Sequence, residues 1–399
     1  MLEPDDLPLA GTTVLDFSQF LAGPVAALRL ADLGARVIKV ERPVTGEIGR
    51  TLAFAGRWKD GDTLSFHAMN RGKEAVVADL KDPGDLARVK ALVARADVLI
   101  QNFRPGVMER IGLDPAAAMA LNPGLVYASA SGYGVDGPWA GRPGQDLLAQ
   151  SVAALPWVTA TGDRPVPVGL AIADHLMSCH IAEGVTALLV RKARTGRGGL
   201  VETSLLEGVL DLQVELLTAR LNDPALASGR GPHSAHGYLP APYGLYPTAD
   251  GHLAIAMAPV DRLGRLLGVE ELAARADPAA WWDDRARIER LLADRLRTAP
   301  TRRWLEVLDA ADVWCAPVLT LEQLIEHPAF EAVGMTQVVE RPPAEPGGEP
   351  VRLTTTRSPI RIDGEVLTSG RAAPRLGAQG RLADGADPFA DPFAAHGDG

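Results

Sequence analysis

Residues 14–40, VLDFSQFLAGPVAALRLADLGARVIKV, hold two short apolar segments around one helical segment. The apolar side chains at 14–17 predict a strand that is buried on both faces, as in a parallel sheet. Pro24 stands where a helix can begin, because proline has a fixed φ and no N–H to leave unpaired. Gly34 ends that helix, and 37–40 (VIKV) is the next strand. Strand, helix and strand in this order predict a parallel βαβ unit.

The same alternation continues along the chain. Further strands are predicted at 75–80, 98–101, 125–130 and 200–204, and helices at 83–96, 174–194 and 205–221. Because strands that alternate with helices form a parallel sheet covered on both faces, we expect an α/β protein with a Rossmann-like large domain. Ligands of such sheets bind at the carboxyl ends of the strands. No G-x-G-x-x-G follows the first strand, which disfavours a nicotinamide dehydrogenase.

Composition narrows the class of protein. The formal net charge of −10 argues against broad nucleic-acid binding, because there is no basic excess to displace counterions. The two cysteines, Cys179 and Cys315, are far apart, so they predict neither a disulfide framework nor a zinc site. No uncharged apolar stretch of ~18 residues and no signal-peptide pattern occurs. We therefore expect a cytoplasmic protein with no membrane span and no nucleic-acid partner.

Length and local composition suggest how the chain is divided. A chain of 399 residues exceeds one core of typical size, so two domains are expected. Gly, Pro, Ser and His dominate 222–242, where we place a junction. The tail at 384–399 repeats Ala-Asp-Pro-Phe and is expected to be disordered.

A set of short motifs, spread in order over nearly the whole chain, resembles the CaiB/BaiF group, the class III CoA-transferases. The motifs lie at 14–24, 33–42, 70–73 (NRGK), 102–106 (NFRPG), 131–134 (SGYG), 137–138, 243–251, 312–318 and 374–377 (PRLG). This group includes formyl-CoA transferase, carnitine CoA-transferase and α-methylacyl-CoA racemase. The resemblance implies an enzyme whose substrates are an acyl-CoA and a small carboxylic acid. It implies no tightly bound cofactor and no metal.

The resemblance also implies an architecture that periodicity does not show. Members of the group form an interlocked homodimer, in which two subunits are threaded like chain links. The large domain then takes in 1–222 together with a returning C-terminal segment at 326–383, and 223–325 forms a smaller α+β domain. Active sites lie between domains of different subunits.

Asp146 is the candidate nucleophile. It stands in Gly144-Gln-Asp-Leu-Leu, after a glycine-rich turn region and at a predicted helix start. The matching aspartate of the transferases attacks the thioester carbonyl and passes through anhydride and aspartyl-CoA intermediates. This is covalent catalysis, which divides one difficult exchange into easier steps. From position alone, the alternative is an aspartate that caps a helix N-terminus.

Gln145 separates two branches of the group. In α-methylacyl-CoA racemases the residue before the aspartate is a histidine, which works with a second aspartate to move an α-proton. Gln145 cannot take up a proton, whereas the second aspartate has a counterpart in Asp174. Asp174 could also cap the long helix that follows it. A racemase or isomerase, and a CoA-binding protein without turnover, stay open as alternatives to a transferase.

The resemblance carries over further residues by position. The residues that match the CoA site are Arg42, Lys73, Asn102, Phe103, Arg110 and Tyr133. Arginine suits such a site because its planar guanidinium binds phosphate and stacks on adenine. Leu21 replaces a glutamine that contacts the intermediate in formyl-CoA transferase. This favours an acyl group larger or more apolar than formate or oxalate.

The loop at 229–237 (GRGPHSAHG) corresponds to a mobile glycine run that closes over the intermediate in formyl-CoA transferase. His233 and Gly237 are therefore candidates for a substrate-contacting lid. His233 and His236 have His-x-x-His spacing, but there is no third ligand near them in the sequence, so we predict no metal site.

Overall fold

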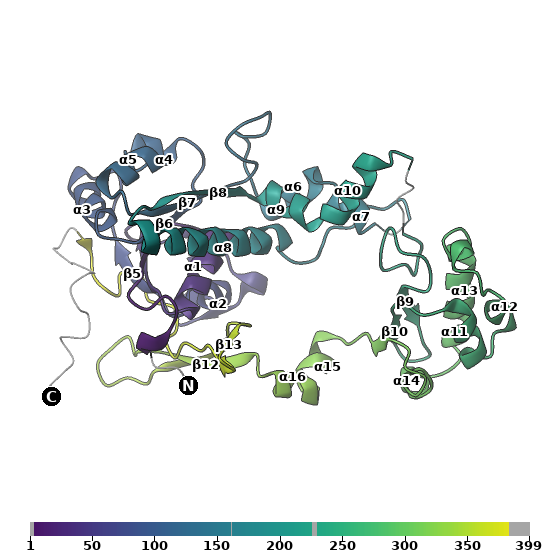
Figure 1. The fold of residues 1–399 in the computed structure, drawn as a ribbon. Helices are drawn as coiled ribbons and strands as arrows, with labels where there is room; N and C mark the ends of the chain where they lie inside the picture. The colour runs from purple at the N-terminus through teal and green to yellow at the C-terminus, as the bar shows by residue number, and fades with distance from the viewer. Residues whose placement is uncertain (1–3, 161, 226–229, 383–399) are drawn as a thin grey trace. The chain divides into compact units, whose positions relative to one another are not determined.

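The computed structural model describes residues 4–160, 162–225 and 230–382 (Figure 1). The chain divides into two compact units, which we call unit 1 and unit 2. Unit 1 comprises Met1–Ala149, Ala171–Leu212 and Val333–Gly399, and unit 2 comprises Gln150–Leu170 and Gln213–Ala332. No helix among the described residues combines the length and the apolar character needed to cross a membrane.

These boundaries differ from the expected ones at three places. Unit 2 includes 150–170 and 213–222, which we expected in the large domain, and it extends to Ala332 rather than to 325. One reason is that the Gln213 side chain donates a hydrogen bond to the carbonyl of Ala153 (2.9 Å), which ties the two segments together. The helix expected over 205–221 is interrupted at the same residue, between α9 (Leu205–Leu212) and α10 (Val214–Asn222). The tail at 384–399 lies outside the described residues.

Unit 1 is built on a six-stranded sheet whose strand order is β5-β2-β1-β6-β7-β8. All neighbouring strands in it are parallel. The strands are β1 (Thr13–Asp16), β2 (Arg36–Glu41), β5 (Glu74–Val77), β6 (Val98–Gln101), β7 (Val126–Ser131) and β8 (Gly199–Ser204). Their carboxyl ends meet at one edge of the sheet, because parallel strands all run the same way.

Helices cover both faces of this sheet, because the strands are apolar on both faces. One face packs on α3 (Pro83–Val93), α4 (Val107–Arg110) and α5 (Pro115–Leu121), and the core there includes Leu15, Ile38 and Leu99 from the strands. On the other face, α1 (Ala22–Asp32) and the long α8 (Ile172–Thr195) lie side by side (Figure 1). Unit 1 also holds α2 (Leu64–Asn70), the start of α6 (Asp146–Val152), and the short pairs β3 (Trp58–Lys59) with β4 (Asp62–Thr63) and β14 (Arg361–Ile362) with β15 (Glu365–Val366).

The C-terminal segment returns to unit 1 as the hairpin of β12 (Thr336–Arg341) and β13 (Val351–Thr356). Arg341, at the end of β12, is 2% exposed and pairs with Asp60 (3.0 Å) and Asp62 (2.7 Å). Further along, the carbonyl of Gly380 accepts a hydrogen bond from the backbone N–H of Val77 in β5 (3.2 Å). Side-chain and backbone contacts therefore both anchor this segment to the N-terminal part.

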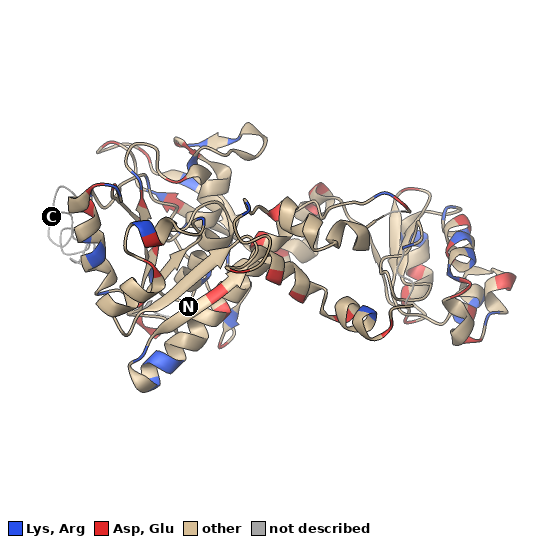
Figure 2. Ribbon diagram, turned by 90° about the horizontal axis from the view of Figure 1, so that it is seen from above, with Lys and Arg blue, Asp and Glu red and all other residues tan. Residues whose placement is uncertain are grey.

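Unit 2 has a three-stranded antiparallel sheet, β11-β10-β9, packed on helices. Its strands are β9 (Gly244–Pro247), β10 (His252–Ile255) and β11 (Cys315–Pro317), and its helices are α7 (Leu155–Val158), α10, α11 (Val260–Leu267), α12 (Glu270–Ala273), α13 (Arg285–Leu296), α14 (Thr301–Asp309), α15 (Leu321–Glu326) and most of α16 (Pro328–Val333). Charged residues of both signs are intermixed along the helices of unit 2 (Figure 2), and some are paired, as Arg287 is with Glu271. This mixture fits a solvated surface.

Candidate active site

Asp146 is held at the N-terminus of the 24-residue helix α8. Its Oδ1 accepts hydrogen bonds from the backbone N–H groups of Ala173 (2.6 Å) and Asp174 (3.3 Å). Ala171, the residue at the N-cap position of α8, provides no side-chain cap, so Asp146 supplies an acceptor for these first-turn donors. The positive end of the helix dipole favours a carboxylate at this position.

Two glycines fix the segment that leads to Asp146. Gly132 follows β7 and Gly144 precedes Asp146, and the two backbones touch. A Cβ built on Gly144 would lie 2.4 Å from the Cα of Gly132, and one built on Gly132 would lie 2.6 Å from the Cα of Gly144. The hydroxyl of Tyr133 also donates to the carbonyl of Pro143 (3.3 Å). The approach to Asp146 is therefore pinned to the carboxyl end of β7.

Asp174 stands beside Asp146, and it does not take the alternative role of capping α8, because the helix begins at Ile172 with Ala171 at the N-cap position. The backbone N–H of Ala22, at the start of α1, lies near its carboxylate. Burial, and next the negative charge of Asp146, raise the pKa of Asp174 to about 6, against the opposing effect of the Ala22 N–H. The site thus holds two carboxyl groups, of which Asp174 resists ionisation.

Five of the remaining unit 1 candidates lie in loops that emerge from neighbouring strands. Leu21 follows β1, Arg42 follows β2, Asn102 and Phe103 follow β6, and Tyr133 follows β7. Since β2, β1, β6 and β7 are consecutive in the sheet, these loops share its carboxyl edge. The fold thereby brings together residues up to 112 positions apart, from Leu21 to Tyr133.

The surroundings of these candidates differ. Arg42 is exposed, with its Nε donating to the Gly46 carbonyl (2.7 Å). Arg110 is exposed at the end of α4. Phe103 is half-buried and packs against the core of unit 1. Both arginine side chains are therefore accessible to solvent in the single chain.

Asn102 joins two loops of the site. Its Oδ1 accepts from the backbone N–H of Gln19 and its Nδ2 donates to the carbonyl of the same residue, both at 2.8 Å. This reciprocal pair fixes the loop after β6 to the loop after β1.

Lys73 is not placed for a phosphate contact. It is 1% exposed, and its Nζ donates to Asp16 Oδ2, the Pro24 carbonyl and Asn70 Oδ1, each at 2.8 Å. An ammonium group has three donors, and all three are used. Burial, which outweighs the attraction of Asp16, lowers the pKa of Lys73 to about 8. The structure favours an internal role for Lys73 over the CoA contact that we expected.

The candidates in unit 2 lie in the loop before β9. The ring of His233 stacks on Tyr246 at 5.6 Å between ring centroids. Gly237 lines a cavity of about 230 Å³ together with Trp157, Arg230 and Tyr238. Residue 229, the first of the predicted lid, lies outside the described residues. Over the described ranges, no group of three or more His, Cys, Asp or Glu side chains could hold a metal ion.

Sequence reasoning missed two features of the site. Ala173 contributes only its backbone N–H, so no side chain in the sequence could reveal it. Phe20 has a φ of 63°, which is rare for a bulky residue. Its N–H donates to the buried Glu47 (3.1 Å), and the sequence gives no sign that these two residues meet.

Known proteins are similar to this chain in sequence and in fold. Residues 9–380 match the model of CoA-transferase family III. The chain is 34% identical over 385 residues to a succinate–glutarate CoA-transferase of Agrobacterium fabrum, covering 93% of each chain. It is 32% identical over 385 residues to an acetyl-CoA:oxalate CoA-transferase of Acetobacter aceti, covering 94% of each. A solved structure of a CaiB/BaiF family protein from Brucella suis matches with a TM-score of 0.79 and 32% identity, over 94% of this chain and 97% of that one.

A full-length family match, relatives above 30% identity and the six-stranded parallel sheet agree with one another. The chain belongs to CoA-transferase family III and is a class III CoA-transferase, an enzyme whose substrates are CoA thioesters.

Proposed function

We propose that the enzyme transfers CoA between carboxylic acids through covalent intermediates on Asp146. The observation that carries this proposal is the position of the Asp146 carboxylate, whose Oδ1 faces the backbone N–H groups of Ala173 and Asp174. A carboxylate oriented in this way can act as a nucleophile, and the same donors can stabilise negative charge that later develops on it.

The first half of the reaction loads the enzyme. A carboxylate oxygen of Asp146 attacks the thioester carbonyl carbon, the C–S bond breaks, and CoA leaves as a thiolate. The product is a mixed anhydride between the acyl group and Asp146. The thiolate then attacks the carbonyl carbon of Asp146, the anhydride C–O bond breaks, and the donor acid leaves as a carboxylate. In this step the Asp146 carbonyl oxygen becomes an oxyanion, for which the N–H groups of Ala173 and Asp174 are suited.

The second half reverses these steps with another acid. The acceptor carboxylate attacks the aspartyl-CoA carbonyl, the thiolate leaves, and a new anhydride forms. Attack of the thiolate on the acceptor acyl carbon then releases the new acyl-CoA and restores the Asp146 carboxylate. No proton is gained or lost overall, so an amide at Gln145 is compatible with the chemistry, whereas two-base racemisation would need a proton carrier there.

For the substrates, we propose small carboxylic acids. The relatives described above are named for succinate and glutarate, and for acetyl-CoA and oxalate; succinate, glutarate and oxalate are dicarboxylates, whereas acetate is a monocarboxylate. Leu21, at the start of α1, favours acyl groups larger or more apolar than oxalate or formate.

We also propose that the enzyme forms the interlocked homodimer that the family implies. Sedimentation should show a particle of twice the chain mass, and a monomer at assay concentration would contradict it.

The substitution Asp146→Asn tests the mechanism. Because an amide is a poor nucleophile, CoA transfer should fall by more than about a thousandfold, while acyl-CoA binding measured by calorimetry persists. The control is Asp114→Asn. Asp114 also accepts two backbone N–H bonds at a helix N-terminus, from Ala116 and Ala117, both at 3.1 Å. Wild-type exchange of the α-proton with deuterated water, without CoA transfer between acids, would favour the racemase alternative.

A further inference from the structure

Three successive residues in the loop after β1 have backbone groups bound by side chains from elsewhere in unit 1. Lys39 Nζ donates to the carbonyl of Ser18 (2.8 Å). Asn102 binds both backbone groups of Gln19, and Glu47 Oε2 accepts from the N–H of Phe20 (3.1 Å). A surface loop that needed only to connect β1 to α1 would not require this many anchors.

The same loop has a strained backbone conformation. Phe20 adopts a φ of 63°, in the left-handed region that bulky residues avoid. Gly23 lies so close to Ser18 that a Cβ on the glycine would be 2.2 Å from the Ser18 Cβ. Backbone strain of this kind persists when the surroundings over-determine it, and it gathers at functional sites.

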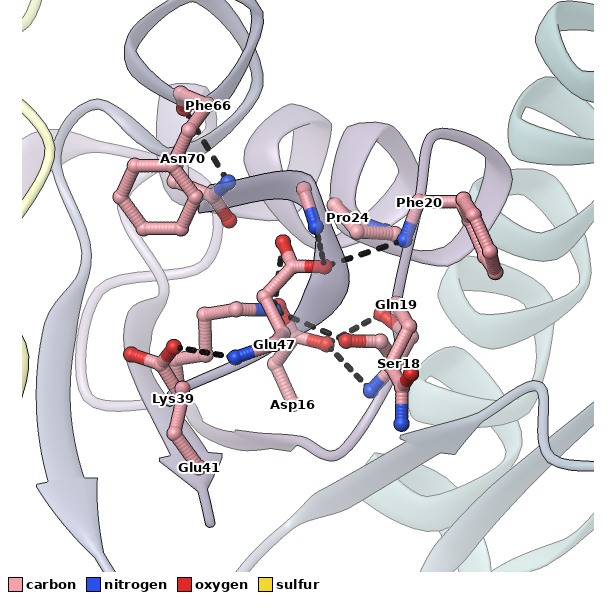
Figure 3. A network of polar contacts seen from close by, with 12 residues as sticks. Asp16, Ser18, Gln19, Phe20, Pro24, Lys39, Glu41, Glu47, Phe66 and Asn70 are labelled. Carbon is pink, nitrogen blue, oxygen red and sulfur yellow. Dashed lines mark hydrogen bonds and ion pairs between the residues drawn. The ribbon is translucent and has the colours of Figure 1, made fainter. Parts of the chain in front are cut away.

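Two of these anchors, Lys39 and Glu47, belong to one buried group, the loop cluster, which we define as Asp16, Lys39, Glu47 and Lys73. Figure 3 shows Asp16, Lys39 and Glu47 of this cluster. Each of these side chains is at most 4% exposed. Lys73 binds Asp16 at 2.8 Å, and Lys39 lies 3.5 Å from Asp16 and 3.6 Å from Glu47. Burial alone would raise the pKa of Asp16, but the two ammonium groups lower it, and the net shift is downward. Two cations and two anions thus balance, and removal of one charge would leave another buried and uncompensated.

The loop held by this cluster ends at the candidate active site. The Lys73 ammonium binds the carbonyl of Pro24 (2.8 Å), in the first turn of α1. That turn belongs to α1, which packs against α8, and the Ala22 N–H near the Asp174 carboxylate favours its ionised form. The backbone N–H of Asp174 in turn donates to Asp146 Oδ1 (3.3 Å). Contacts therefore run from the loop cluster through the start of α1 to the helix that binds the candidate nucleophile.

We propose that the loop cluster is a positioning device for catalysis: it holds the backbone of residues 18–24 in place, and with it the start of α1, which packs against α8, the helix whose first-turn N–H groups bind Asp146. This inference rests on the proposed role of Asp146 as the nucleophile. None of the four side chains needs to touch the substrate. They act through the backbone of residues 18–24, so a residue-by-residue comparison of substrate contacts would not reveal them.

Asp174 is the group through which the effect should be measurable. Its titratable and charged neighbours are Asp146 from α6, His175 beside it on α8, and Arg29 of α1, which lies 3.0 Å from the His175 ring. Charge on Asp174 opposes the oxyanions and carboxylates that gather at Asp146. The rate constant kcat should therefore fall as the pH rises through the Asp174 midpoint. Displacement of the Ala22 N–H from this carboxylate should move that midpoint upward, because the N–H favours the ionised form.

The test compares Glu47→Gln with Glu74→Gln, in holoenzyme assays of CoA transfer. Glu74 is a matched control, since it is also buried and paired with a cation, Arg36 at 2.9 Å, but lies on β5 away from the loop. Glu47→Gln should lower the kcat plateau about ten- to a hundredfold, as expected for misplacement of a reacting group by about 1 Å. The acyl-CoA KM should change less, and the pH midpoint should rise. Glu74→Gln should lower only the unfolding midpoint.

Two further variants keep the outcome decisive. Ser18→Ala removes the hydroxyl bond to Asp16 without changing a charge, so it should fold and shift kcat and the pH midpoint in the same direction by less. In an Asp174→Asn background, Glu47→Gln should produce no pH shift. The inference is overturned if Glu47→Gln, or Ser18→Ala should the former not fold, changes stability while kcat and its pH profile stay at wild type. Absence of an Asp146 adduct in the wild-type enzyme would instead overturn the proposed function.

Discussion

Asp174 lies beside Asp146 at the start of α8, and its carboxyl group loses its proton at a higher pH than an ordinary aspartate. Burial and the charge of Asp146 raise its pKa from 3.8 to about 6. The folded state therefore holds a proton that the unfolded chain has already lost between these two values. Ionised Asp174 opposes folding above about pH 6, and this penalty disappears as the pH falls below about 4.

The substitution Asp174→Asn should consequently stabilise the enzyme at neutral pH. Asparagine cannot ionise, yet its carbonyl can still lie near the Ala22 N–H. A shift of two pKa units corresponds to about 3 kcal/mol, so we expect a gain of about 1–3 kcal/mol at pH 7. Thermal unfolding at pH 7 and pH 4 measures it. A variant as stable as wild type at pH 7, or an equal gain at both pH values, would contradict this account of Asp174.

At this scale the sequence predicts side chains better than it predicts their partners. Asp146 is identifiable because its motif is specific. The hydrogen bond that it accepts from Ala173 is not identifiable from the sequence. The donor is a backbone N–H group 27 residues away, and residues of many types could provide the same group. The motif that contains Lys73 indicates that this residue is important, but it does not indicate which role the residue has. Burial decides the role, and burial depends on where Asp16 and Asn70 lie in the fold.

At the scale of elements, the contact between the β7 loop and the segment before α6 determines where Asp146 stands. Gly144→Ala would place a Cβ 2.4 Å from the backbone of Gly132, which cannot move aside as a flexible side chain could. We expect kcat to fall by about a hundredfold as Asp146 is displaced. Gly141→Ala is the control, because its φ is not positive and no heavy atom of the described chain lies within 4 Å of the added Cβ. It should change kcat by less than about twofold.

The strands of the parallel sheet were predictable because apolar runs between turn residues have few other solutions. The predicted 98–101 matches β6 (Val98–Gln101), and 200–204 matches β8 (Gly199–Ser204) to within one residue. The prediction of one continuous helix over 205–221 was wrong in one respect, because the observed helix is interrupted at Gln213. The break coincides with a tertiary hydrogen bond from the Gln213 side chain to the Ala153 carbonyl. Local periodicity cannot indicate such a bond.

At the scale of the whole molecule, the returning C-terminal segment is part of unit 1 through Arg341. Its guanidinium is buried against Asp60 and Asp62 and also donates to the Ala373 carbonyl (2.8 Å). Arg341→Leu removes one partner of a buried ion pair, which costs about 3–5 kcal/mol. We expect a cost at the lower end of this range, because Asp62 keeps its ion pair with Arg50 (2.9 Å).

Arg352→Leu is the matched control for Arg341→Leu. Arg352 pairs with Glu340 at 3.0 Å in the same hairpin, but the two side chains are 69% and 52% exposed. Exposed pairs contribute about 0–1 kcal/mol. Urea unfolding should separate the two variants clearly, and equal destabilisation would show that burial of Arg341 does not anchor the segment.

The division into units could be predicted only in outline. The junction expected from composition at 222–242 falls inside unit 2, whose second segment begins at Gln213. The return of the C-terminal segment came from family resemblance, because nothing in the local sequence near Arg341 indicates Asp60. Contacts between residues 281 positions apart are set by the folded chain as a whole.

Trapping of the covalent intermediates proposed on Asp146 tests its role as the nucleophile. The direct measurement incubates the purified enzyme with a panel of acyl-CoAs, quenches it with hydroxylamine, and maps the adducts by peptide mass spectrometry. Hydroxylamine converts an activated aspartyl carbonyl into a hydroxamate. The account predicts a hydroxamate on Asp146, with certain thioesters only, and none on Asp114. A wild-type enzyme that transfers CoA between acids with no hydroxamate on Asp146, or with one on another residue, would contradict it.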